Sequence, residues 1–325
     1  MRWDIVYKGK NVLVAGGTGF VGVNLIRRLL ELGADVTATI HKKEPVLQDD
    51  RIRYVRCDLT RQEDCHRVAQ GMDFVFMCAA NTSGAAVIEK NPLTHVTPNV
   101  IMNLLILEAA YSANVKKVLF ISSNTVYPAY THPVKEEEMM TGDLFEKYFC
   151  VGWMKRFSEI ACEMYATKIR NPMQVVVVRP ANIYGEYDDF EWETSHVLPA
   201  LIRKVVERHA PLEVWGDGKD LKDFIYVGDF VEGILSAMEK IEGYEPVNIG
   251  SGRSISIREA LQTILAVDGY EDAQVVYNQS KPSMIPVRKI DVTKAEQLIG
   301  FSAETSFEEG IRNTIRWYRQ SRASE

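Results

Sequence analysis

Three glycines near the start of the chain have the spacing with which a protein backbone can hold phosphate groups. They lie in the run Gly-Gly-Thr-Gly-Phe-Val-Gly, after an apolar stretch and at the start of an amphipathic one. Gly16 permits a tight turn, Gly19 lets the backbone approach a pyrophosphate, and Gly22 allows close packing of a helix on a strand. Free N–H groups at the helix start then meet the phosphates. The predicted dinucleotide contacts are Gly16, Thr18, Gly19, Phe20, Val21 and Gly22.

The residues after the second predicted strand bear on which dinucleotide binds. This strand is followed by His41, Lys42 and Lys43, with no carboxylate before Glu44. An Asp or Glu here would accept hydrogen bonds from the ribose hydroxyls of NAD, whereas cations suit the 2′-phosphate of NADP. The pattern therefore favours NADP over NAD, with His41 and Lys42 as contacts. The alternative is that these residues only form a solvated loop.

Two further strand ends complete the predicted cofactor site. Asp58 follows the third strand, where its carboxylate can meet the adenine amino group. Ala79 and Ala80 follow the fourth strand and are small enough for the cofactor to approach the backbone.

Short β-branched runs alternate with longer amphipathic segments, which predicts an α/β fold of the Rossmann type with a doubly wound parallel sheet. We expect strands at 11–15, 35–40, 53–57, 74–78, 117–122, 174–179 and 247–249. We expect helices at 20–32, 61–70, 92–113, 150–169, 196–208, 228–241, 256–267, 292–298 and 306–319. Residues 1–180 should form the dinucleotide-binding domain, to which 222–250 return, and residues 181–325 mainly a smaller substrate-binding part.

Composition and charge exclude several classes of protein. A net charge of -6 argues against a nucleic-acid partner. No stretch approaches the roughly 20 apolar residues that span a bilayer, and residues 1–10 lack a signal-peptide core. The 5 cysteines show no metal-site spacing, so we expect reduced thiols, no metal and a cytoplasmic protein. The long helices at 92–113 and 150–169 are apolar on more than one face, which indicates burial on two sides or, as we favour, a homodimer contact.

Together these motifs resemble those of the extended short-chain dehydrogenase/reductase superfamily, the NAD-dependent epimerase/dehydratase family. The N-terminal markers are the glycine loop, Asp58-Leu59, Ala79-Ala80, Asn99 and the run 122–127. Later runs at 179–185, 195–204, 214–218 and 288–293 are most similar to the GDP-L-fucose synthases. Those enzymes use NADPH to epimerise and reduce a 4-keto GDP-sugar. The resemblance runs nearly end to end and implies further cofactor contacts at Leu59, Ser122, Lys155, Pro180 and Ile183.

The resemblance also implies a catalytic Ser, Tyr and Lys, of which two are present. Ser123 and Lys155 stand at the Ser and Lys positions, but the Tyr of Tyr-x-x-x-Lys is replaced by Val151, which cannot exchange a proton. Three interpretations stay open. Tyr148, one helical turn earlier, reaches the same space, or His196 transfers the proton, or the protein binds its ligands without turnover.

The substrate side of the resemblance is more complete. The fucose synthases epimerise with a Cys base and a His acid. Thr125 stands at the Cys position and cannot act as a base near neutral pH, whereas His196 is retained. The resemblance implies substrate contacts at Thr125, Asn182, His196, Val197, Lys204, Trp215, Lys222 and Arg288. The three cations among them suit a diphosphate; the alternative is that they are merely solvated charges. Trp215 either stacks on the nucleotide base or fills the core.

The sequence therefore predicts an NAD(P)-dependent enzyme that modifies an NDP-sugar, with a GDP-sugar favoured, through hydride exchange at C4. It does not separate an epimerase from a dehydratase or a reductase. The alternative is a catalytically impaired or non-catalytic protein that binds the cofactor and a nucleotide sugar.

Overall fold

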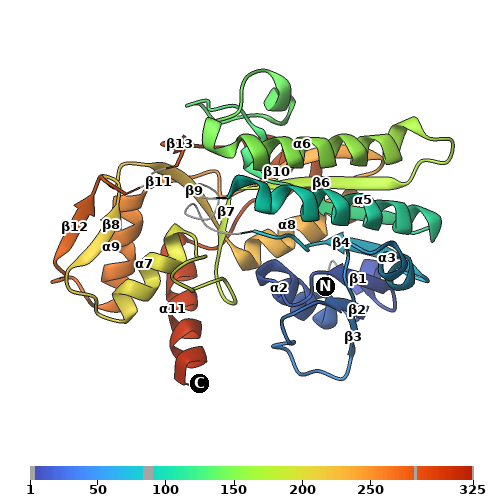
Figure 1. Ribbon diagram of the computed structural model, residues 1–325. Helices are drawn as coiled ribbons and strands as arrows, with labels where there is room; N and C mark the ends of the chain where they lie inside the picture. The colour runs from blue at the N-terminus through green and yellow to red at the C-terminus, as the bar shows by residue number, and fades with distance from the viewer. Residues whose placement is uncertain (1–3, 83–90, 282–283, 324–325) are drawn as a thin grey trace.

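A seven-stranded, fully parallel sheet forms the larger part of the protein, as a computed structural model that describes residues 4–82, 91–281 and 284–323 shows (Figure 1). Its strand order is β10-β6-β5-β4-β1-β2-β3, and every pair in it is parallel. The strands are β1 Asn11–Ala15, β2 Asp35–Ile40, β3 Ile52–Arg56, β4 Phe74–Met77, β5 Lys117–Ile121, β6 Gln174–Pro180 and β10 Tyr244–Ile249. The predicted doubly wound α/β fold is confirmed.

Helices cover both faces of this sheet because its strands are apolar on both sides. Val12 and Val14 of β1 belong to one core, and Leu13 and Ala15 belong to the other. The first core includes α2 (Phe20–Glu31) and α8 (Val227–Lys240). The second includes α3 (Gln62–Ala69), α5 (Val96–Ser112) and α6 (Phe149–Glu163). None of the helices in the described ranges is both long and apolar enough to cross a membrane.

A smaller part lies at one end of the large sheet and has a core of its own (Figure 1). Its strands are β7 Asn182–Tyr184, β8 Leu212–Trp215, β9 Leu221–Tyr226, β11 Ser254–Ser256, β12 Val275–Asn278 and β13 Val287–Arg288. In one sheet β9 pairs with β7, β11 and β13, and in a second β8 pairs with β12. Helices α7 Val197–Val206, α9 Ile257–Asp268 and α11 Phe307–Ala323 pack around them.

The sequence pattern missed all six strands of this smaller part. They have two to six residues and mix polar, charged and aromatic side chains, so neither alternation nor a continuous apolar run marks them. The two long predicted helices are each divided. A 3₁₀ turn, Pro92–His95, precedes α5, and a π turn, Met164–Lys168, follows α6. The other α-helices among the described residues are α1 Asp4–Tyr7 and α10 Thr293–Ile299.

The direction of the strands fixes where a ligand can bind. The chain order reverses between β1, which continues to β2, and β4, which lies on its other side. In an open parallel sheet, ligands bind outside the carboxyl ends of the strands at such a switch point. The glycine loop follows β1 there, and Ala79 follows β4.

Candidate active site

The glycine loop has the close packing that a phosphate-binding turn requires. Gly16 has φ +93, and a Cβ on it would lie 2.6 Å from the backbone nitrogen of Ala79. A Cβ on Gly22 would overlap the carbonyl oxygen of Gly16. At Gly19 such a Cβ would meet only the Gly16 oxygen, at 3.3 Å, which is a tight contact but a smaller conflict than at Gly16 or Gly22. The first backbone N–H groups of α2 have no partner within the helix, which fits a pyrophosphate at this position.

This geometry predicts different outcomes for two alanine variants. Gly22→Ala should lower the free energy of unfolding by about 1–3 kcal/mol, because helix and loop must move apart. Gly19→Ala should change it by no more than about 0.5 kcal/mol and yet weaken NADPH or NADH binding by roughly tenfold or more, since the methyl group enters the space for phosphate. Urea unfolding and calorimetry measure the two effects. Equal losses of stability in both variants would contradict this assignment.

The adenosine side of the loop is held by a residue that the sequence reasoning missed. Thr39 of β2 accepts a hydrogen bond from the Gly16 N–H through Oγ1, at 2.8 Å, and its carbonyl accepts one from Gly17 at 2.9 Å. A buried threonine in the strand beside a glycine turn was the only available signal.

His41 and Asp58 come together at the carboxyl ends of the neighbouring strands β2 and β3. Asp58 accepts two hydrogen bonds from Thr60, and these, with the nearby His41, lower its pKa. The carboxylate therefore remains an acceptor for an amino group. Lys42 is exposed beside His41, and Leu59 is buried.

The backbone after β4 is clamped by an asparagine from α5. Asn99 accepts from the N–H of Asn81 at 2.8 Å and donates to its carbonyl at 2.9 Å. Ala79 is half-buried and Ala80 is exposed, so Ala80 leaves the backbone accessible.

Ser123 and Lys155 flank the carboxyl end of β5. The Ser123 hydroxyl accepts hydrogen bonds from the backbone N–H and the hydroxyl of Thr125, at 3.1 and 3.0 Å. The Lys155 ammonium donates to the carbonyl of Ile121, the last residue of β5, at 2.9 Å. Gly152 allows α6 to pack closely against the segment that follows β5, because a Cβ there would lie 2.6 Å from the Thr125 carbonyl oxygen.

Val151 and Tyr148 lie in different surroundings. Val151 is half-buried on α6, one turn before Lys155. Tyr148 precedes the helix, and its ring lies 5.8 Å from the guanidinium of Arg288. Burial raises the pKa of Tyr148, which Arg288 opposes. The structure thus places Tyr148 beside Arg288 of the smaller part of the protein.

His196 lies at the start of α7, in the smaller part of the protein. Its ring is exposed, but surrounding protein lowers its pKa by desolvation, opposed by Asp189. Val197, the first residue of α7, is exposed beside it.

Two of the predicted substrate cations are direct neighbours. Lys222 of β9 and Arg288 of β13 are register partners in a parallel pair. Arg288 is 3% exposed, and its Nε and Nη2 have no hydrogen-bond partner. Burial lowers the pKa of Lys222 to about 8, and Asp220 opposes this. Lys222 is half-buried, donates to the carbonyl of Ile285 and lies 3.8 Å from a carboxylate oxygen of Asp220. The unused donors of the pair are therefore those of Arg288, and a buried guanidinium with free N–H groups suits an anion.

The other predicted substrate residues are distributed over β7, β8 and α7. Lys204 donates to the carbonyl of Glu213 at 2.7 Å, which places it beside β8 rather than with the cation pair. Trp215 is 43% exposed, and the Lys281 ammonium lies 5.7 Å from its ring, so it does not fill the core. Asn182 donates to the carbonyl of Asp223 at 2.8 Å. Pro180 is buried and Ile183 half-buried where the two sheets join.

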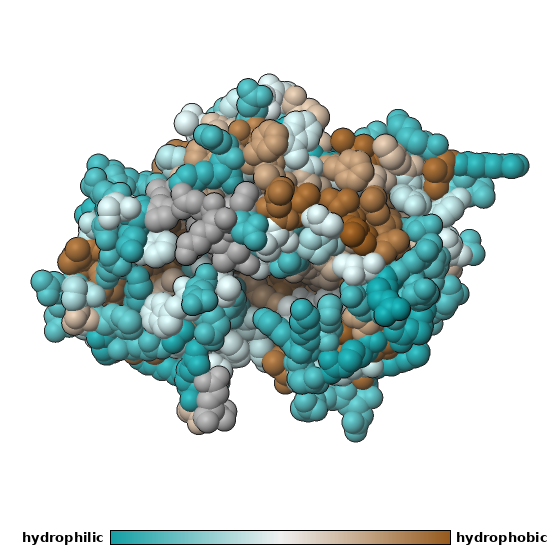
Figure 2. Space-filling model, in the orientation of Figure 1, coloured by the Kyte–Doolittle hydropathy of each residue, from teal (hydrophilic) through white to brown (hydrophobic). Residues whose placement is uncertain are grey.

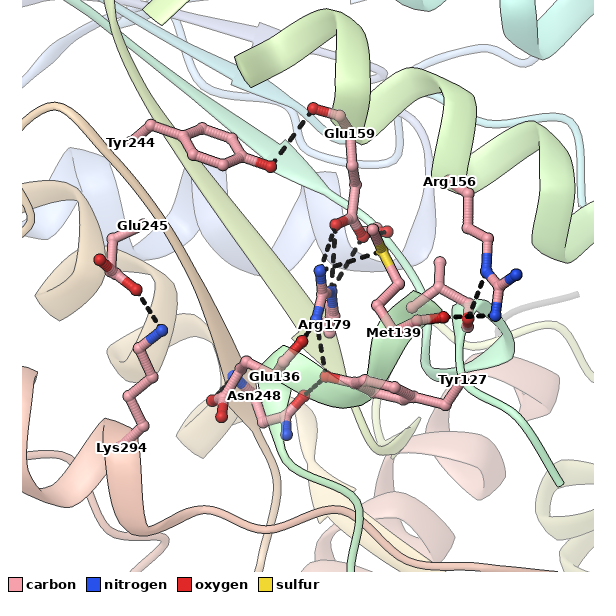
Figure 3. Close-up of polar contacts among 12 residues, drawn as sticks. Tyr127, Glu136, Met139, Arg156, Glu159, Arg179, Tyr244, Glu245, Asn248 and Lys294 are labelled. Carbon is pink, nitrogen blue, oxygen red and sulfur yellow. Dashed lines mark hydrogen bonds and ion pairs between the residues drawn. The ribbon is translucent and has the colours of Figure 1, made fainter. Parts of the chain in front are cut away.

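A buried polar network holds the elements around Ser123 and Lys155 together (Figure 3). Glu159 of α6 pairs with Arg179 of β6 and accepts the Ser122 hydroxyl, which therefore points into the core. Arg179 also donates to the Tyr127 hydroxyl at 2.9 Å, which donates to Asn248 at 2.6 Å. The network was missed because only the pairing of distant strands brings these residues together.

A parallel sheet with a glycine turn at its switch point and catalytic-type side chains at its carboxyl edge defines a dinucleotide-binding α/β protein of the Rossmann class. The NAD dependent epimerase/dehydratase family matches residues 12–250. The chain belongs to this family, for which NAD(P) binding is typical.

The relatives include GDP-L-fucose synthase of Escherichia coli (strain K12). It is 31% identical over 327 residues, which cover 96% of this chain and 97% of the relative. The resemblance to the fucose synthases is confirmed at this level.

Solved structures of nucleotide-sugar proteins share the fold. UDP-glucose 4-epimerase of Thermotoga maritima, solved with UDP-glucose, superposes with a TM-score of 0.85 at 26% identity, covering 96% of this chain and 99% of its own. MoeE5, solved with UDP-glucuronic acid and NAD, gives 0.84 at 25% identity, covering 96% and 99%. Nucleotide sugars are thus bound by homologues with this architecture.

Proposed function

We propose that this protein is an NAD(P)-dependent enzyme that modifies an NDP-sugar by hydride exchange at C4, in an active site made atypical by Val151. Among nucleotide sugars we favour a GDP-sugar, because the relatives with fucose-synthase names match the chain over almost its full length. Epimerase, dehydratase and reductase outcomes all remain within this proposal.

The glycine loop supports the cofactor part. Gly16 and Gly22 leave no room for a Cβ, while Gly19, at the N-terminus of α2, would bring a Cβ to 3.3 Å from the Gly16 oxygen. When bound, the dinucleotide would supply the hydride at its nicotinamide. The loop and Asp58 would bind its adenosine and pyrophosphate, and Ser123 and Lys155 would face its nicotinamide end.

The cationic end of the site supports the substrate part and carries the proposal. Arg288 keeps two donor nitrogens unpaired although it is almost fully buried, and Lys222 lies directly beside it. Leaving buried donors unsatisfied costs about 1–3 kcal/mol, which an anionic diphosphate would recover. Tyr148, against Arg288, and Trp215 would contact the nucleotide, whereas Asn182 and His196 would contact the sugar.

The cofactor preference follows from the end of β2. His41 and Lys42 follow β2, at the position that we expect to meet the adenosine ribose, and Asp58 after β3 accepts hydrogen bonds from Thr60. We therefore favour NADP over NAD.

A hydride-transfer assay tests the function. Purified protein is incubated with NADPH or NADH and a panel of 4-keto GDP-, UDP- and dTDP-sugars, and in the reverse direction with NADP or NAD and the corresponding sugars. We expect turnover with at least one sugar, detected at the nicotinamide absorbance and by product analysis. Absence of turnover with the whole panel, together with tight cofactor binding, would instead support the second candidate, a non-catalytic binding protein, which Val151 favours.

The exposed apolar side chains of α5 and α6 support a homodimer. Phe149, Trp153, Phe157 and Met164 recur along one side of α6 and its continuation. Ile101 of α5 is exposed too, and Figure 2 shows apolar surface gathered over these two helices. Apolar surface of this kind marks association sites.

Introducing a charge on this apolar surface tests the dimer. Phe157→Lys should weaken self-association by roughly tenfold or more, because a charge must then be buried at the contact. Val276→Lys, at an exposed apolar position on β12, is the matched control and should leave self-association unchanged. Sedimentation over a range of concentrations measures both, and a wild-type protein that stays monomeric would rule the dimer out.

A further inference from the structure

Lys155 is a buried lysine that no carboxylate of the described residues neutralises. It is 8% exposed, and its ammonium donates one hydrogen bond, to the Ile121 carbonyl at 2.9 Å. The same nitrogen lies 4.8 Å from the centre of the Phe120 ring. Within the described ranges it forms no ion pair. A buried ammonium without a counter-ion releases its proton more readily than a solvated one.

The carboxylate nearest along the helix is committed elsewhere. Glu159, one turn after Lys155, is fully buried and receives three hydrogen bonds from Arg179, at 2.5, 3.0 and 3.1 Å. It also accepts the Ser122 hydroxyl. In Figure 3 the Arg179 guanidinium faces the Glu159 carboxylate directly. Arg179 therefore balances most of the charge of Glu159, which opposes the loss of the Lys155 proton only in part.

Two other titratable groups near this part of α6 carry no negative charge that would hold a proton on Lys155. Cys162 lies on the same helix, and Tyr244 of β10 donates to the Glu159 carbonyl at 3.3 Å. Burial raises the pKa of both Cys162 and Tyr244, so both stay neutral near pH 7. No phenol stands at position 151.

On these observations we infer that Lys155 is itself the proton-transfer group at the sugar C4 oxygen. This inference rests on the proposed function. Val151 leaves the space one turn before Lys155 without an acid, and the Lys155 ammonium lies at the same strand end as Ser123. Tyr148 faces Arg288, and His196 lies on α7 of the smaller part.

The step balances without a further reactant. In the reductive direction Lys155 would give a proton from its ammonium to the C4 oxygen. The reduced dinucleotide, when bound, would supply the hydride to C4. The N–H bond breaks, its electron pair stays on nitrogen, and an O–H bond forms as the carbonyl π electrons move to oxygen. Water then returns a proton to the neutral amine. In the oxidative direction each transfer is reversed.

The proton affinity of Lys155 suits this role. Burial lowers its pKa to about 8, opposed by Glu159. General acids and bases work best when their pKa lies near the working pH. Because the acid form is required for reduction, the reductive kcat should be constant below about pH 8 and fall above it, and the oxidative kcat should show the opposite dependence.

Substitution separates proton transfer from binding. Lys155→Arg keeps the charge but cannot release a proton near neutral pH, so kcat should fall by roughly 10²–10⁴-fold while calorimetry shows retained cofactor binding. Lys168→Arg, at an exposed lysine after α6, is the matched control and should leave kcat unchanged. Tyr148→Phe should leave the pH dependence of kcat in place.

A direct titration gives a readout independent of turnover. The side-chain NMR signals of ¹³C-labelled lysines, with the Lys155 signal assigned from its absence in Lys155→Arg, should show this amine titrating near pH 8. A midpoint above pH 10, or a Lys155→Arg enzyme with wild-type kcat, would overturn the inference and leave the proposed function standing. A wild-type protein without turnover on the whole sugar panel would overturn both.

Discussion

Glu159→Gln is expected to lower the free energy of unfolding by about 3–5 kcal/mol, because it leaves the Arg179 guanidinium buried without its counter-ion. Arg179 is 2% exposed and Glu159 is fully buried. Arg179 also donates to Tyr127 and to the Glu136 carbonyl, so the loss reaches the segment that follows Ser123. Urea unfolding, followed by the near- and far-ultraviolet signals, measures the change.

Two further variants identify the cause of that loss. Glu159→Leu combined with Arg179→Met removes both charges and should recover most of the stability, since a buried pair is often replaceable by apolar residues of similar size. Ser122→Ala removes only the hydroxyl donor and should cost about 1 kcal/mol. If Glu159→Gln cost no more than Ser122→Ala, the ion pair would not be the main element of the network.

Glu159→Gln should also alter catalysis through Lys155. The Glu159 carboxylate raises the pKa of Lys155 against the larger effect of burial. Its removal should lower this pKa further, so that the reductive kcat begins to fall at a lower pH than in the wild type.

Val151→Tyr is expected to rescue the Lys155→Arg enzyme by roughly 10–100-fold in kcat, since it restores a proton donor one helical turn from position 155. The guanidinium of the arginine would favour the ionised phenol and so lower its pKa. The half-buried Val151 side chain leaves one side accessible to the larger ring. Rates of hydride transfer with a sugar that the wild type accepts measure the rescue.

Val151→Phe in the same background is the matched control. It introduces the same ring without the hydroxyl and should leave kcat at the level of Lys155→Arg. Equal rates for the Tyr and Phe variants would show that position 151 does not face the reacting oxygen.

These two predictions depend on different contributions of the sequence. The hydrophobic pattern of the first 180 residues was enough to predict all strands of the large sheet except β10, because a parallel strand buried on both faces must be a continuous apolar run. The glycine spacing was enough to predict the phosphate turn, because Gly16 and Gly22 have no space for a Cβ. The missing phenol at Val151 was equally evident, since it is read at a fixed distance from Lys155.

Only the tertiary structure decided how the charges are partnered. Glu159 stands one turn from Lys155 in the sequence, yet β6 brings Arg179 to it, and no other carboxylate of the described residues pairs with Lys155. Arg288 and Lys222 are neighbours only because β13 pairs with β9. The strands of the smaller part are short and polar, so their pairing comes from packing rather than from local pattern. Local order follows from side-chain type and spacing, whereas the proton affinity of a buried group depends on contacts between residues far apart in the chain.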